Sequence, residues 1–104
     1  MNALPATPSL LAVARRVVWF KQPEETLADP IHFLAHVMTY GTAEDLQALN
    51  DSVGADALRE VLREVLRHPP PGVFDGRSWA YWHYRLGLTP PGQPVPPLPQ
   101  RRFD

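Results

Sequence analysis

Thirteen prolines are spread unevenly along this chain of 104 residues, and they limit where a helix can run. Proline lacks a backbone N–H and its ring collides with the preceding turn, so a helix accepts it in the first turn but not in the interior. Pro69, Pro70 and Pro71 therefore exclude a helix and form a stiff connector. From Thr89 onward, prolines recur so often that neither a helix nor a central strand can form. Helices must therefore lie in the segments that these prolines leave free.

The first of these segments has apolar residues at helical spacing. We expect a helix capped by Thr7 or Ser9, running to about Phe20 or Lys21, and ended by Pro23. Residues 24–28 are long enough for a single further helical turn.

The next segment carries two start signals and one stop signal. Asp29 followed by Pro30 is typical of an N-cap and a first helical residue. Gly41 is expected to end this helix in the left-handed conformation. Thr42 then opens another helix, with Asp45 in the place of the usual glutamate of a capping box.

Gly54 separates that helix from a strongly amphipathic one that begins near Asp56. The polar face of the second helix has alternating charges and is interpreted as a solvated face formed by Arg59, Glu60, Arg63, Glu64 and Arg67. A last, aromatic-rich helix is expected over about 76–86, with Asp75 as its N-cap and Gly87 after its end.

No segment shows a sustained alternation of apolar and polar residues, so the sequence predicts no sheet. The length favours one domain. We predict an all-α protein in which residues 1–88 form a compact bundle of about five short helices. Residues 89–104 are predicted to be an extended, proline-rich C-terminal arm.

Composition excludes several classes of function. The chain has no cysteine, so disulfides, thiol nucleophiles and thiolate metal sites are excluded, and a cytoplasmic location is expected. The formal net charge is −1, whereas nucleic-acid-binding proteins usually carry a basic excess. The apolar stretch from Leu10 to Phe20 is interrupted by Arg15 and Arg16 and is far shorter than the roughly 20 residues needed to span a bilayer.

One group of residues has the spacing of a metal site. Asp29, His32 and His36 would share one helix face, where imidazole and carboxylate ligands bind zinc. We favour the simpler interpretation, in which Asp29 caps the helix and both histidines lie at its polar edge. His83 and Ser78 have no sequence neighbours that would complete a catalytic group. We therefore predict no enzymatic activity, no cofactor and no bound metal.

The aromatic helix and the C-terminal arm are the candidate contact regions. Tryptophans in so small a domain are expected to complete the core, yet large aromatics beside arginines are also typical of interface anchors. The arm contains a proline-x-x-proline-x-basic pattern at 96–101, as in ligands of SH3 domains, but we favour a general binding arm. The predicted partner-binding residues are Phe74, Trp79, Trp82, Tyr84, Arg101, Arg102 and Phe103.

Several stretches resemble a group of small bacterial proteins encoded beside nucleotidyltransferase-like toxins of the AbiEii type. They are FLAHVMTYGT at 33–42, PPGVFD at 70–75, RSWAYWH at 77–83 and PLPQRRF at 97–103. The resemblance covers about residues 19–103. It implies an antitoxin-like protein whose partner is a nucleotidyltransferase toxin.

The sequence therefore leads us to consider two functions that belong to different classes. The first is a protein-binding module that neutralises a toxin by blocking its active cleft or holding it in an inactive shape. The alternative is a DNA-binding regulator with a helix-turn-helix at 42–67, whose Arg59, Arg63 and Arg67 would face the DNA. Glu60 and Glu64 share that face and would repel phosphate, so DNA is not favoured. The oligomeric state is left open.

Overall fold

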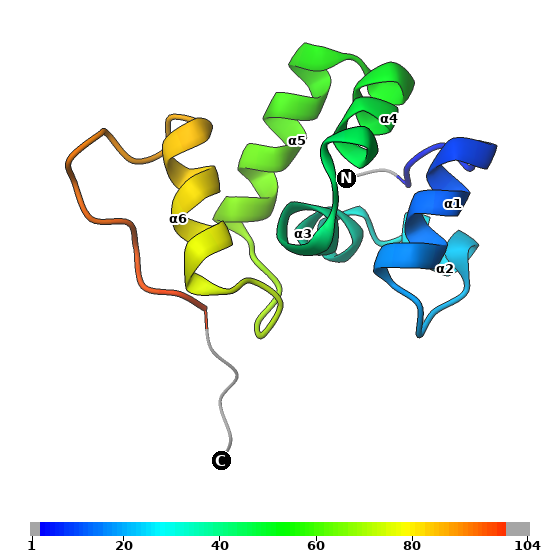
Figure 1. The fold of residues 1–104 in the computed structure, drawn as a ribbon, viewed down its shortest axis with the longest axis horizontal. Coiled ribbons are helices and arrows are strands. Elements are labelled where there is room, and N and C mark those ends of the chain that lie inside the picture. Colours follow the sequence, from blue (N-terminus) through cyan, green and yellow to red (C-terminus); the bar gives the residue numbers. More distant parts are fainter. Residues whose placement is uncertain (1–2, 100–104) are drawn as a thin grey trace.

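A computed structural model describes residues 3–99, in which the chain forms six α-helices and no strand (Figure 1). The all-α prediction is confirmed, and the helix beyond the expected five is the short second one. The helices are α1 (Pro8–Val17), α2 (Pro23–Leu27), α3 (Pro30–Tyr40), α4 (Ala43–Val53), α5 (Ala55–Arg67) and α6 (Gly76–Arg85).

Three of the helices begin with a proline, namely Pro8, Pro23 and Pro30. Pro23 therefore starts α2 and does not end α1, and the prediction that α1 reaches Phe20 is wrong. The helix ends earlier because Val18 leaves the helical conformation, with φ −125° and ψ 68°, while its side chain is fully buried. This change of direction brings α2 back against α1.

Two predicted N-caps are confirmed by their hydrogen bonds. The Asp45 backbone N–H donates to the Thr42 hydroxyl at 3.2 Å, and the Thr42 N–H donates to the Asp45 carboxylate at 2.9 Å. The Ser78 N–H donates to the Asp75 carboxylate at 2.7 Å. Each cap satisfies backbone donors that the first turn of a helix leaves without partners.

The predicted cap at Asp29 is wrong in one respect. Asp29 is the N-cap residue of α3, but its side chain makes no hydrogen bond to the helix. Its carboxylate lies 3.9 Å from the Lys21 ammonium instead.

Gly41 ends α3 as predicted, but it is not in the left-handed conformation, because its φ is −77°. A Cβ atom at this position would lie 2.5 Å from the Val37 carbonyl oxygen and 2.9 Å from a Val37 methyl group. Glycine is therefore needed here for a close approach of the backbone. Gly54 and Gly87, with φ of 88° and 73°, are in the left-handed region.

Replacing Gly41 tests this explanation. We expect Gly41→Ala to lower the free energy of unfolding by about 1 kcal/mol, because the new methyl group meets backbone that cannot move aside freely. Gly76→Ala is the matched control, since a Cβ at Gly76 meets nothing within 4 Å, and it should be neutral or slightly stabilising. Urea unfolding of both variants measures the difference, and equal stabilities would contradict the explanation.

The core is built around α3. Figure 1 shows this helix in the middle of the fold, with α1 and α2 on one side and α5 and α6 on the other. A helix covered on several sides is apolar around most of its circumference, as α3 is. The largest fully buried apolar side chains are Phe33, Leu10, Leu27, Leu34, Leu49, Val18, Val37 and Val65.

After α6 the described chain has no regular secondary structure, and it turns and runs back beside that helix (Figure 1). The Trp79 indole N–H donates to the Pro96 carbonyl at 2.8 Å, and the Tyr84 hydroxyl hydrogen-bonds to the Gln93 carbonyl. Val95 and Leu98 are partly buried against the core. Residues 89–99 thus lie along α6, while residues 100–104 of the predicted arm lie outside the described residues.

Candidate functional site

The four predicted contact residues that the structure describes do not share one exposed surface. Phe74, Trp79 and Trp82 are buried in the core, so they serve the packing of the domain. Tyr84 is exposed. The other three predicted residues, Arg101, Arg102 and Phe103, lie outside the described residues.

Large aromatic side chains are exposed at a different place. Trp19 is 80% exposed and Phe20 is 54% exposed, in the turn between α1 and α2. Tyr40, the last residue of α3, is 63% exposed. Single exposed aromatics are ordinary, but neighbouring ones indicate a binding surface.

Two histidines lie between these exposed rings, His32 partly buried and His36 buried, so the prediction that both histidines lie at the polar edge of the helix is wrong for His36. The ring centroids lie 5.7 Å apart for Trp19 and Phe20, and 5.9 Å apart for Phe20 and His36. His36 lies 4.3 Å from His32 and 6.0 Å from Tyr40. We call these five residues the aromatic surface. Such ring pairs are within the distances at which aromatic side chains attract each other.

The local sequence explains how this surface arises. His32, His36 and Tyr40 follow each other at intervals of four residues, so they lie along one face of α3. The early end of α1 turns Trp19 and Phe20 out of the helix and toward that face. The sequence showed both aromatic residues at the end of a helix, but not that the chain would turn them onto α3.

His32 is uncharged at neutral pH. Burial lowers the pKa of His32 most, and the neighbouring His36 and Lys21 lower it further. The His36 Nδ1 lies 2.8 Å from the His32 carbonyl oxygen and, since a carbonyl only accepts, this nitrogen donates the hydrogen bond. Beside the aromatic surface, the Lys21 ammonium lies 3.9 Å from the Asp29 carboxylate, so these two opposite charges offset each other.

The histidines do not assemble with a carboxylate into a metal site. Within residues 3–99, no three His, Cys, Asp or Glu side chains are grouped so that they could hold a metal ion. His32 and His36 share a face as predicted, but Asp29 faces Lys21 and one nitrogen of His36 is already used.

His83 is the other histidine with an unusual environment. It is buried against Trp79, with ring centroids 4.4 Å apart, and burial lowers its pKa. Its nearest polar partner is the Thr89 hydroxyl, 3.4 Å from Nδ1. Its Nε2 has no hydrogen-bond partner in the described part of the chain. In the described residues, no carboxylate forms a hydrogen bond or ion pair with His83.

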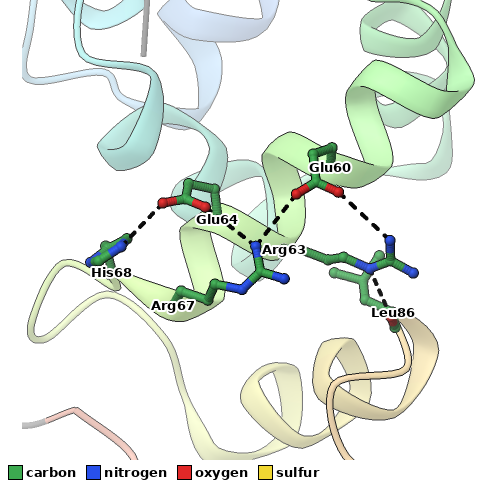
Figure 2. A network of polar contacts seen from close by, with 6 residues as sticks. All are labelled: Glu60, Arg63, Glu64, Arg67, His68 and Leu86. Atoms are coloured by element: carbon green, nitrogen blue, oxygen red, sulfur yellow. Dashed lines mark hydrogen bonds and ion pairs between the residues drawn. The ribbon is translucent and has the colours of Figure 1, made fainter.

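Two of the three arginines proposed for DNA binding are engaged within the protein (Figure 2). The Arg63 Nε donates to the Leu86 carbonyl at 3.0 Å, so this side chain caps the C-terminus of α6. Arg67 lies 3.4 Å from Glu60 and 3.3 Å from Glu64. The face is therefore mixed in charge.

The same charged face continues to the end of α5. The His68 Nε2 lies 3.1 Å from Glu64, which places the imidazole beside a carboxylate (Figure 2). Exposed pairs of this kind contribute about 0–1 kcal/mol each. Acidic and basic side chains thus alternate on this face of α5, and its glutamates would repel the phosphates of DNA.

Comparison with protein-family models, curated proteins and solved structures finds no match for this chain. In the described part of the chain, no helix combines the length and the apolar character needed to cross a membrane.

Proposed function

We propose that this protein acts by binding another protein through the aromatic surface. The observation that supports this most directly is the exposure of Trp19, Phe20 and Tyr40, whose rings are linked through the buried ring of His36. Tryptophan and tyrosine are enriched among the residues that dominate binding energy at protein interfaces. Leaving such side chains in water forgoes roughly 1.5–3 kcal/mol of burial energy each, and a partner that covers them recovers it.

The partner we propose is a nucleotidyltransferase toxin, in a bacterial cytoplasm. This part of the proposal depends on the resemblance of residues 19–103 to proteins encoded beside such toxins. The aromatic surface lies within that range, and the stretch 33–42 includes His36 and Tyr40. Binding would act sterically, by covering the active cleft of the toxin or by fixing an inactive shape. Tyr84 and the terminal residues Arg101, Arg102 and Phe103 remain proposed secondary contacts.

Copurification with the product of the neighbouring gene tests the proposal. The variant Trp19→Ser/Phe20→Ser should weaken the complex at least about tenfold, because it removes two anchors from the interface. Its thermal unfolding should stay close to that of the unaltered chain, because both side chains are exposed. Titration calorimetry with the purified partner gives the dissociation constants.

Tyr81→Ser is the matched control, since Tyr81 is an exposed aromatic on α6, away from the aromatic surface. It should bind as tightly as the unaltered chain. Undiminished binding by the double variant would remove the aromatic surface from the proposal. Failure of the unaltered chain to form any complex would exclude the toxin as its partner.

A further inference from the structure

A second surface, distinct from the aromatic one, lies where α4, α5 and α6 meet. It is an open pocket of about 340 Å³. Its lining combines the partly buried Leu46 and the largely buried Leu58 and Leu62 with the polar side chains of Gln47 and Asn50. A pocket of this size and lining accommodates a few apolar side chains of a binding partner.

The charged residues that line this pocket are two arginines, Arg59 and Arg85, and no acidic side chain lines it among the described residues. Arg85 hydrogen-bonds to the Tyr81 hydroxyl, and its guanidinium lies 5.7 Å from the centre of the Tyr81 ring and 5.5 Å from that of Trp82. These contacts hold the charge at the mouth of the pocket.

Arg59 differs from the other arginines of α5. Arg63 and Arg67 both lie within 4 Å of glutamates, whereas Arg59 pairs with no carboxylate in the part of the chain that the structure describes. Arg59 is exposed and lines the pocket. The pocket thus combines leucine side chains with two positive charges that pair with no carboxylate among residues 3–99.

We propose that this pocket binds an acidic peptide segment of a protein partner. Leucine-like side chains of the peptide would lie against the leucines of the pocket, and its carboxylates would accept hydrogen bonds from Arg59 and Arg85. Charge complementarity selects this occupant, since the C-terminal residues of the chain itself include Arg101 and Arg102 and would add like charge. Nucleic acid fits less well, because Trp82 is buried and offers no ring face on which a base could stack.

Nuclear magnetic resonance of the isotopically labelled full chain tests this inference. The probe is a short synthetic peptide with leucines along one helical face and glutamates beside them. We expect shifts of backbone amide signals concentrated on α4, α5 and the C-terminal half of α6. Arg59→Gln/Arg85→Gln should weaken binding of this peptide about tenfold, since two partly exposed charge pairs are lost.

Two kinds of matched control separate the loss of the pocket arginines from a general loss of positive charge. Arg15→Gln/Arg77→Gln removes the same charge from exposed positions that do not line the pocket, and it should bind the peptide as the unaltered chain does. The variant Trp19→Ser/Phe20→Ser should also bind the acidic peptide as the unaltered chain does. A loss of peptide binding can then be assigned to the pocket, and a loss of toxin binding to the aromatic surface. A peptide with lysine in place of each glutamate should bind at least tenfold more weakly.

The inference would be overturned by an absence of shifts at the pocket, or by equal binding of the glutamate and lysine peptides. It would also be overturned if a single-stranded oligonucleotide bound the pocket more tightly than the acidic peptide. A tenfold loss in the Arg15→Gln/Arg77→Gln control would show that net charge, and not the pocket, determines binding.

Discussion

Replacing Trp82 by alanine is expected to lower the free energy of unfolding by about 3–5 kcal/mol. The indole is buried in the core, and truncation of a buried large aromatic side chain costs about 3–5 kcal/mol. Domains of this size have a total stability of roughly 5–15 kcal/mol. The loss is therefore a large part of the whole, and circular dichroism with urea unfolding measures it.

Trp82 has a second role that separates it from an ordinary core residue. Its indole N–H donates to the Met38 carbonyl oxygen at 2.8 Å. Met38 lies in the last turn of α3, where carbonyls have no partner within the helix. The hydrogen bond from α6 thus caps the C-terminus of the central helix.

The variant Trp82→Phe isolates this second role. It keeps most of the apolar volume but removes the donor, so it should lower the free energy of unfolding by about 1–3 kcal/mol through the buried Met38 carbonyl. Tyr81→Phe, at the exposed neighbouring position, is the matched control and should change stability by less than about 0.5 kcal/mol. A Trp82→Phe variant as stable as this control would show that the hydrogen bond contributes nothing.

Features that depend on residues close together in the sequence could be predicted. The capping box of Thr42 and Asp45 and the cap at Asp75 each join positions three residues apart. Such signals depend only on local geometry. The end of α1 could not be predicted in this way, because it is determined by the burial of Val18 and by the packing of α2.

The candidate site shows the same difference between features that depend on local sequence and features that depend on tertiary packing. The sequence contains three tryptophans of equal hydrophobicity, and only the tertiary structure shows that Trp79 and Trp82 are buried while Trp19 is exposed. The spacing of His32 and His36 predicted a shared helix face, and the structure confirms it. What the spacing could not show is that aromatic rings from a distant turn, and not a carboxylate, would lie beside these histidines.

The two surfaces occupy different parts of the fold. The aromatic surface is formed by α3 and the turn before α2, whereas the pocket is formed by α4, α5 and α6.

The ion pair between Arg16 and Asp45 joins α1 to α4, and its loss is the second large effect that we expect. The Asp45 side chain is almost completely buried, whereas Arg16 is about half exposed. Burial alone would raise the pKa of Asp45, but the hydrogen bonds from Arg16 and Thr42 outweigh it and hold the pKa below its ordinary value of 3.8. The Asp45 carboxylate is therefore charged at neutral pH, and the hydrogen bonds from Arg16 and Thr42 stabilise that charge.

Arg16→Met should lower the free energy of unfolding by about 2 kcal/mol at neutral pH. Removing one partner of a buried pair costs about 3–5 kcal/mol, but here Arg16 is half exposed to solvent and the Thr42 hydrogen bonds remain, so the cost is smaller. Arg15→Met is the matched control on the same helix, since Arg15 is exposed and pairs with no carboxylate in the described residues. It should be nearly neutral.

The pH dependence gives the sharper test. Without Arg16, the pKa of Asp45 in the folded state should rise, because burial is then less strongly opposed. The wild-type chain retains the stabilising contribution of Asp45 above pH 3.8 and loses it as the pH falls through the lowered pKa. The stability difference between wild type and Arg16→Met should therefore be full at neutral pH and vanish as the pH falls through both folded-state pKa values. Urea unfolding from neutral to acidic pH measures it, and a difference that stays constant would show that Arg16 acts through packing and not through the charge of Asp45.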